Sequence, residues 1–461
     1  MSDIKSMMLP EIVEVDNFSA NMPPTEIRTQ TIYNKPRNSS NTSATFVIEN
    51  SGILNMKTTK LVLQGLSSTT NNNKLAYPCN VGICSYIRRA ILRGANSGGV
   101  ICTSDNFANY FSITHNSFTS TERKVNYDRF TYGVMSGFNV VIDGLDNRYD
   151  GSGIANGNNQ TNTIHSLKST VDAGSNFSIE LSSLFPGFNE QDIPLYLLSQ
   201  PLELEILFTP ENTIGDRVVV CNGGNTTDKN DVALSQLLLM EDHIFFSDMR
   251  MNQIREQYRN NPYTSTYNDL ISTRNALSGA TSTTAVRSSH TISGAGKIVS
   301  KVLCANPITD VNDNSVFHAF GKYGSSGELE KKTFNLTINN EKMFPIDVSN
   351  MNVAIMNAIF GSLYGNNYVE IPYSLQCKLQ SVGMCDAQYN GQNDYADMFG
   401  ELNYFGCDLG ESRVNSVPIE MELFRHHSTA PGLKTEDLVV FLAIKRIFSI
   451  LPNGNISVSY S

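Results

Sequence analysis

A short glycine-rich segment that ends in a lysine is the first candidate for chemistry in this sequence. Residues Gly294–Lys297 read GAGK, which is similar to the end of a phosphate-binding loop. Such a loop needs another glycine at its start and a Ser or Thr after the lysine, because backbone N–H groups and a hydroxyl must reach the phosphates and their Mg²⁺. The sequence has Thr291 and Ile298 at these two positions. We therefore expect no nucleotide site here.

An acidic run suggests a calcium loop. Residues Asp310–Asn314 read DVNDN, with side-chain oxygens at alternate positions. A calcium loop of the helix–loop–helix type also needs a glycine at its sharp turn and a glutamate at its end. Ser315 and Gly321 occupy these positions instead. The run predicts at most an adventitious surface cation.

Histidines and cysteines, the usual transition-metal ligands, are not spaced for a metal site. Only two of the seven histidines are adjacent, His426 and His427, and neighbours on a strand point to opposite faces. A cupin enzyme requires a His-x-His pair on one strand, and the sequence has none. The nearest cysteines, Cys79 and Cys84, have no second pair to complete a zinc site. Because no signal peptide is recognisable, we expect reduced thiols, mostly buried, in a protein made in the cytoplasm.

Two pairs of glutamates complete the candidates for chemistry. Glu203 and Glu205, like Glu420 and Glu422, are two residues apart in segments with strand patterns. Both members of a pair then lie on one solvated strand face, whereas glycoside hydrolysis needs two carboxylates across a cleft. Serine-hydrolase, zinc-protease and dinucleotide-binding motifs are also missing. We predict no catalytic, cofactor-binding or metal-binding residues and no enzyme activity.

The composition favours a β-protein with long polar loops. The chain has 461 residues, of which 17% are charged and 40% hydrophobic, with a net charge of −10. Residues 1–40 contain five acidic and four basic side chains. They therefore do not form the basic arm that displaces counterions from nucleic acid. We expect no direct contact with nucleic acid.

Strand patterns recur along the whole chain after residue 40. The clearest is Pro201–Phe208, PLELEILF, in which apolar residues alternate with polar ones. Further strands are predicted at residues 44–49, 60–66, 86–94, 138–145, 233–246, 297–303, 334–338, 418–424, 438–448 and 455–461. One helix is predicted at Asp347–Gly365, between a capping residue and a glycine.

The strand pattern repeats once. Pro418–Arg425, PIEMELFR, matches Pro201–Phe208 in its proline, both glutamates and its alternating apolar positions. The match indicates a duplicated β-domain. We place the boundary in the polar segment Thr209–Asp231, which predicts an extended N-terminal arm at 1–40 and two domains at 41–212 and 213–461.

These segments, in this order, resemble the double jelly-roll major capsid proteins of the adenovirus-hexon-like lineage. The resemblance is to the proteins of virophages, Polinton-like viruses and nucleocytoplasmic large DNA viruses. It is carried by YLLSQPLELEILFTP (Tyr196–Pro210), VALSQLLLMEDHIFF (Val232–Phe246), FNLTINNEKMFP (Phe334–Pro345) and the apolar strands near the C-terminus.

The resemblance implies an all-β chain of two tandem eight-stranded antiparallel jelly rolls with long loops and a few short helices. Three chains then form a pseudo-hexameric homotrimer, or capsomer, in the icosahedral shell of a double-stranded DNA virus. Expected partners are the chain itself, neighbouring capsomers, and penton and minor or cement proteins, and the expected location is the virion after synthesis in the host cytoplasm. We expect the long loops Asp146–Ser175 and Arg259–Gly296 to form the outer crown and the trimer contacts.

Two alternatives remain open at this point. One is another virion surface protein, a spike or penton with glycan-binding jelly rolls, although a penton needs only one barrel and the chain has no Trp. The other is a bicupin-type enzyme. An inner membrane is a further candidate partner: the apolar residues Met7, Met8, Leu9 and Ile12 suggest an anchoring N-terminal segment, while the longest apolar runs are too short to cross a bilayer.

Overall fold

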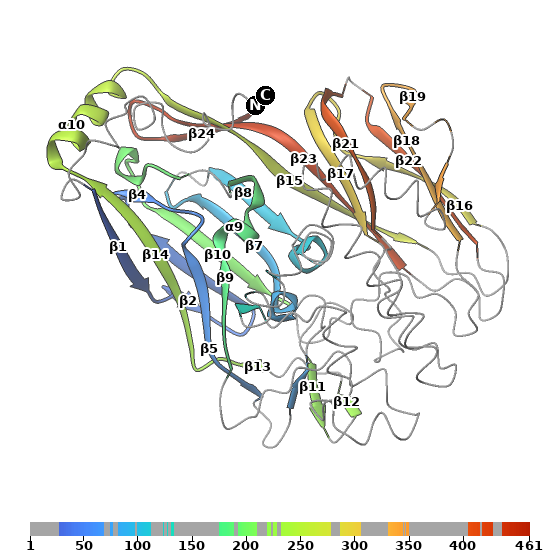
Figure 1. Cartoon of the computed structure of the whole chain (residues 1–461), viewed down its shortest axis with the longest axis horizontal. Helices are drawn as coiled ribbons and strands as arrows, with labels where there is room; N and C mark the ends of the chain where they lie inside the picture. The colour runs from blue at the N-terminus through green and yellow to red at the C-terminus, as the bar shows by residue number, and fades with distance from the viewer. Residues whose placement is uncertain are drawn as a thin grey trace.

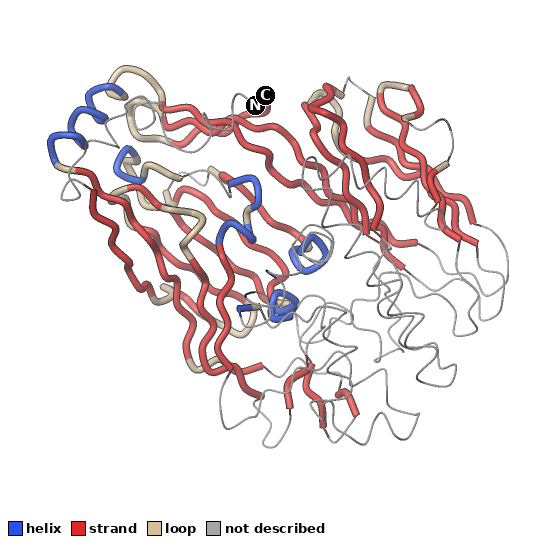
Figure 2. Tube along the Cα trace, in the orientation of Figure 1, coloured by secondary structure: helices blue, strands red, loops and turns tan. Residues whose placement is uncertain are grey.

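The computed structural model of the chain consists mainly of antiparallel strands (Figures 1 and 2). It describes residues 27–68, 74–76, 82–96, 99–111, 123, 127, 131–132, 175–188, 192–209, 219–222, 225–227, 232–277, 286–305, 331–343, 345, 347–349, 404–414, 417–426 and 436–461. No helix in these ranges is long and apolar enough to cross a membrane.

The first barrel consists of two facing sheets of four main strands each. One sheet has the order β1–β14–β5–β9, formed by β1 (Ile27–Asn34), β14 (Gln236–Phe246), β5 (Lys60–Ser68) and β9 (Ser175–Glu180). The other has the order β3–β10–β7–β8, formed by β3 (Ser43–Ile48), β10 (Leu202–Phe208), β7 (Ile87–Gly94) and β8 (Val100–Asp105). Eight strands in two such sheets form a jelly roll.

The second barrel repeats this arrangement. Its first sheet has the order β15–β23–β17–β21, formed by β15 (Tyr263–Leu277), β23 (Glu436–Ile450), β17 (Ile298–Ala305) and β21 (Tyr404–Arg413). Its second sheet contains β16 (Val286–Ile292), β22 (Ile419–His426) and β18 (Lys331–Ile338), with the short β19 (Glu341–Lys342) and β20 (Val348–Ser349) together in the place of β8. The chain is therefore a double jelly roll.

Shorter elements connect or extend these sheets. The remaining strands are β2 (Asn38–Ser39), β4 (Ile53–Leu54), β6 (Lys74–Ala76), β11 (Val219–Asn222), β12 (Asn225–Thr227), β13 (Val232–Ala233) and β24 (Ile456–Tyr460). The labelled helices are α9 (Leu181–Leu184), α10 (Asp248–Gln257), η3 (Gly82–Tyr86), η5 (Pro186–Phe188) and η6 (Leu195–Leu197). Helix α10 follows the last strand of the first barrel and precedes the first strand of the second.

Alternation of apolar and polar residues builds each core. In β10, Leu202, Leu204, Ile206 and Phe208 are buried, and the residues between them are partly exposed. Each of these apolar side chains contributes about 1.5–3 kcal/mol by leaving water. The repeated strand β22 buries Ile419, Met421 and Leu423 in the same way. β10 lies between β3 and β7, and β22 lies between β16 and β18, so the two matching segments occupy equivalent central positions.

Most predicted strands in the described residues are confirmed. The predictions at 44–49, 60–66, 86–94, 201–208, 297–303, 334–338, 418–424, 438–448 and 455–461 coincide with β3, β5, β7, β10, β17, β18, β22, β23 and β24. The predicted strand at 138–145 and the loop Asp146–Ser175, except its last residue, lie outside the described residues.

The assignment of residues 233–246 to the second domain is wrong. This segment forms β14, which pairs with β1 and β5 and contributes Leu237 and Leu239 to the first core. The polar segment 209–231 is thus a connection within the first barrel. A division between Phe246 and Tyr263 accounts for the strand pairing better than the predicted one at 212/213.

Three further expectations need correction. Residues 27–34 of the predicted arm 1–40 form β1, which pairs with β14; residues 1–26 lie outside the described residues. The predicted loop Arg259–Gly296 is largely strand, because β15 pairs with β23 over its full length and β16 pairs with β22. The predicted helix Asp347–Gly365 is contradicted at its start, where β20 pairs with β18, and its remainder is not described.

Candidate functional site: the junction between the two barrels

An aromatic cluster joins the two barrels. Phe188, from η5 of the first barrel, stacks at a tilt on Tyr267 of β15 with ring centroids 4.2 Å apart. Phe448 of β23 meets Phe188 edge-on at 6.0 Å and Tyr263 of β15 at 6.5 Å. All four rings are buried within the core of the first barrel. Such pairs contribute about 0.5–1.5 kcal/mol each beyond area burial. These ring contacts therefore stabilise the packing of the second barrel against the first.

Buried polar groups fix the register of this contact. The Tyr267 hydroxyl donates a hydrogen bond to the carbonyl of Ile101 in β8. Beside it, Asp269 of β15 accepts hydrogen bonds from Arg446 and from the backbone N–H groups of Leu270 and Thr103. Burial raises the pKa of Asp269 to about 6, although Arg446 opposes the shift. Asp269 therefore carries its charge at neutral pH at a cost that its three partners offset.

The C-terminal strand also spans the junction. After β23 the chain turns at Gly454, whose carbonyl accepts a hydrogen bond of 3.0 Å from the Ser199 N–H of the first barrel. Gly454 has φ +77°, and a Cβ there would lie 2.5 Å from that nitrogen, so only glycine fits. Ile456 and Val458 of β24 then pack against the first core. Figure 1 shows β24, β23 and β15 extending together above the first barrel.

Among the glutamates singled out in the sequence, Glu203, Glu205 and Glu422 make structural ion pairs. Arg93 of β7 binds both Glu203 and Glu205, the second at 3.2 Å. In the other barrel, Glu422 lies 3.1 Å from Lys342. Each pair sits on its own sheet with a basic neighbour, which agrees with the interpretation as strand-face residues.

The other motifs from the sequence are not brought together into a site. The lysine of the GAGK segment, Lys297, lies over the ring of Tyr460 at 4.5 Å. His426 is in β22, whereas His427 and Asp310–Asn314 lie outside the described residues. Among the described residues, Cys84, Cys102 and Cys304 are buried thiols outside any disulfide. Within the described ranges no three His, Cys, Asp or Glu side chains are grouped to hold a metal ion.

The sequence analysis did not identify a buried histidine–glutamate pair, His243 with Glu241. His243 of β14 is fully buried, with Nε2 2.9 Å from Glu241 and Nδ1 2.8 Å from the carbonyl oxygen of Ser51. Asn34 of β1 donates to the other Glu241 oxygen at 2.6 Å. Both ring nitrogens face acceptor oxygens, an arrangement that favours the protonated imidazole ring. Although burial opposes it, bonding to Glu241 and Ser51 raises the pKa of His243 overall. The only sequence signal was two polar residues on the inner face of a strand.

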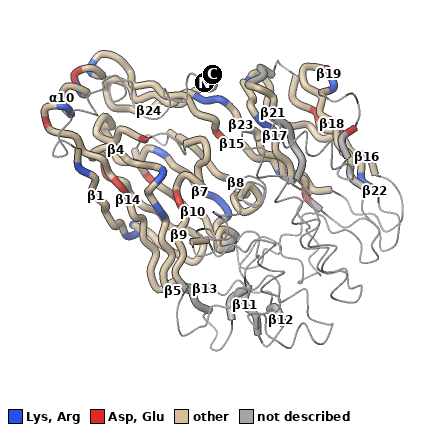
Figure 3. Tube along the Cα trace, in the orientation of Figure 1, with Lys and Arg blue, Asp and Glu red and all other residues tan. Residues whose placement is uncertain are grey.

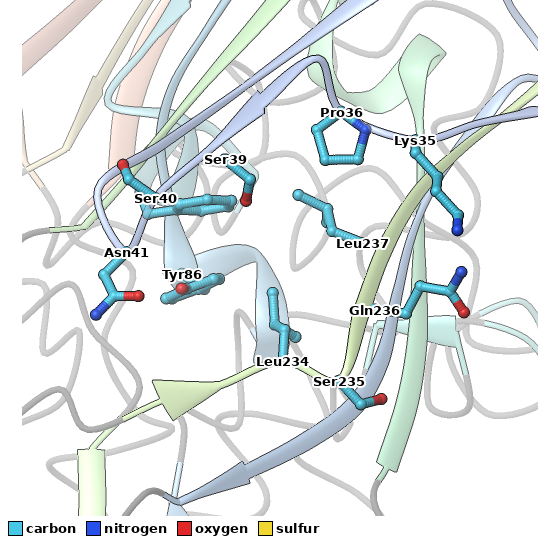
Figure 4. A pocket seen from close by; sticks show the side chains of 11 residues that line it. Lys35, Pro36, Ser39, Ser40, Asn41, Tyr86, Leu234, Ser235, Gln236 and Leu237 are labelled. Carbon is cyan, nitrogen blue, oxygen red and sulfur yellow. The ribbon is translucent and has the colours of Figure 1, made fainter.

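A cavity of about 580 Å³ opens at one end of the first barrel (Figure 4). Tyr86 and Phe208 stack with ring centroids 4.6 Å apart on one side of it, and Leu234 and Leu237 line the other side. Polar side chains make up much of the remaining lining: Lys35, Ser39, Ser40, Asn41, Ser235 and Gln236. On the described strands, most residues are neither acidic nor basic (Figure 3).

Comparison with solved structures identifies this fold in viral shells. No protein-family model and no curated protein sequence matches the chain. PBCV-1 VP54, fitted into a reconstruction of the virophage Sputnik, is similar with a TM-score of 0.56 and 12% identity over 94% of this chain and 97% of that one. The Sputnik virophage structure is similar with a TM-score of 0.50 and 11% identity, over 94% of this chain and 88% of that one. The Faustovirus major capsid protein is similar with a TM-score of 0.50 and 8% identity, over 92% of this chain and 91% of that one.

The fold is therefore that of double jelly-roll major capsid proteins, and the sequence-based fold class is confirmed. The likeness extends over nearly the whole length of both chains, so it covers both barrels and their junction.

Proposed function

We propose that this protein is a viral major capsid protein that assembles as a pseudo-hexameric homotrimer into the icosahedral shell of a double-stranded DNA virus. The observation that carries the proposal is the complete double jelly roll, matched over 94% of this chain and 97% of VP54. Two equivalent barrels held rigidly in one chain suit a subunit of which three copies supply six similar barrels.

The junction supports this mechanical role. A shell subunit must keep its two barrels at a fixed angle, because the lattice repeats that angle many times. The aromatic cluster around Phe188 and the buried Asp269–Arg446 pair supply this rigidity. The similar solved structures named above come from viral capsids, so we propose a structural and non-enzymatic role in the virion.

Partners follow from this role. We propose that the protein contacts its own copies, neighbouring capsomers, and penton and minor or cement proteins, with an inner membrane as a further candidate. The net charge of −10 opposes direct binding of nucleic acid. Synthesis in the host cytoplasm agrees with the buried thiols of Cys84, Cys102 and Cys304.

Light scattering coupled to gel filtration tests the proposal. We expect a mass of three times the chain's 50.9 kDa at about 1 µM protein. A monomer at that concentration contradicts the trimer, and tight stoichiometric binding of Fe, Mn or Zn by metal analysis supports the bicupin alternative instead.

A further inference from the structure

The two barrels have equivalent sheets whose outer faces differ in their surroundings. The sheet β1–β14–β5–β9 of the first barrel corresponds to β15–β23–β17–β21 of the second. Side chains alternate along each strand, so one face of each sheet points into its own barrel and the other, here called the outer face, points away.

The outer face of the second barrel is covered, in part by the first barrel. Phe441 and Leu303, paired neighbours on this face, are 1% and 6% exposed. Tyr110, in the short helical segment after β8 of the first barrel, meets the Phe441 ring edge-on at 5.5 Å. Beside it, the Asn106 side chain donates a hydrogen bond of 3.0 Å to the hydroxyl of Ser272. The contact joins unlike surfaces: an outer face of one barrel and the segment that follows β8 in the other.

The outer face of the first barrel carries a comparable apolar patch that stays open. Tyr33 of β1 pairs with Met240 of β14, and Leu238 of β14 pairs with Val62 of β5. Tyr33 is 64% exposed, and the other three are partly exposed. We call these four residues the outer patch.

The chain itself covers both flanks of the outer patch. On one side Tyr127 lies over Lys60 and accepts a hydrogen bond of 2.8 Å from its ammonium group. On the other side, Ile244 and Phe246 pack in a cluster with Ile254 of α10. The part of the face left between them is therefore bounded like a docking surface, apolar at its centre with polar groups at its edge.

We infer that the outer patch docks the second barrel of another copy of this chain. Within the chain, the first barrel covers the outer face of the second; between chains, the second barrel is the equivalent unit that can cover the outer face of the first. A contact between unlike surfaces closes into a ring when its rotation permits, so three copies complete six similar contacts. This inference rests on the proposed homotrimer and names the surface that forms it.

A double substitution tests the inference in the full-length protein. Tyr33→Lys with Met240→Lys puts two charges on the outer patch but leaves both cores intact. We expect the dissociation constant of the trimer to rise at least about 100-fold, because charges buried at an interface centre are poorly tolerated, and the variant to run as a monomer in light scattering at about 1 µM. The matched control is Met249→Lys, since Met249 on α10 is 69% exposed and outside the patch. We expect it to remain trimeric.

The outcomes separate this inference from the proposed function. If the unaltered protein is monomeric, the homotrimer itself is wrong. If the unaltered protein and the double variant are both trimeric, only the outer patch is wrong. The circular dichroism spectrum of the double variant must match that of the unaltered protein, which shows that the variant is folded. If the double variant is unfolded, Tyr33→Lys alone, at the most exposed of the four positions, gives the same test, and a trimer of this single variant overturns the inference.

Discussion

Replacing Phe188 by Ala should weaken the coupling between the barrels more than any surface change. The side chain is 1% exposed and contacts the rings of Tyr267 and Phe448. Truncating a buried Phe costs about 3–5 kcal/mol through lost burial and the cavity left behind. The two aromatic pairs account for about 0.5–1.5 kcal/mol each of that total. We expect the unfolding free energy to fall by about 3–5 kcal/mol.

Differential scanning calorimetry is the assay for this change. Because Phe188 lies in the junction, its loss should split the unfolding of the two barrels into separate transitions. The control Phe46→Ala removes an equally buried ring from within the first barrel. It should destabilise by a similar amount and leave the coupling of the second barrel unchanged. A loss below about 0.5 kcal/mol for Phe188→Ala, the range of ordinary surface changes, refutes the account of the junction.

Three further predictions concern protons, backbone conformation and the N-terminal segment. Folding raises the pKa of His243 and raises that of Asp269 to about 6. Protonation of these groups therefore favours the folded state, and the stability that it adds is lost as the pH rises through their folded-state pKa values. Urea unfolding should show a higher free energy of unfolding at pH 5.5 than at pH 8. Gly454→Ala should cost at least about 2 kcal/mol in thermal unfolding, because its Cβ meets the first barrel, whereas Gly410→Ala, also at positive φ but in open space, should cost about 1 kcal/mol. Deleting residues 1–20 should leave trimers intact and prevent shell formation in electron micrographs.

Each of these has a clear opposing result. The proton account is wrong if stability rises steadily from pH 5.5 to pH 8, or if Asp269→Asn leaves the slope unchanged. Equal losses for the two glycine variants contradict the clash at the junction. Normal shells from the truncated protein exclude an anchoring role for its first residues.

Strict alternation made the central strands predictable from sequence. In Pro201–Phe208 and Pro418–Arg425 one face meets a single barrel core, so the apolar residues repeat every second position. β15 was missed because it serves two environments. Tyr263 and Tyr267 pack on the first barrel, while Leu277 belongs to the second core, and polar residues fill the positions between them.

The boundary between the barrels was misplaced for a related reason. A jelly roll pairs its first strand with its last, so β14 follows a long polar connection and still belongs to the first barrel. Composition alone makes that connection look like a linker. The junction itself joins residues distant in sequence, such as Phe188 and Tyr267, and no local pattern reports such a contact.

Electron microscopy of the purified protein tests the central claim most directly. Class averages of single particles should show a six-lobed, pseudo-hexagonal outline with threefold symmetry, as expected for three chains of two barrels each. Particles with only two lobes, at a concentration where light scattering gives a single species, would contradict a capsomer and with it the proposed role in a viral shell.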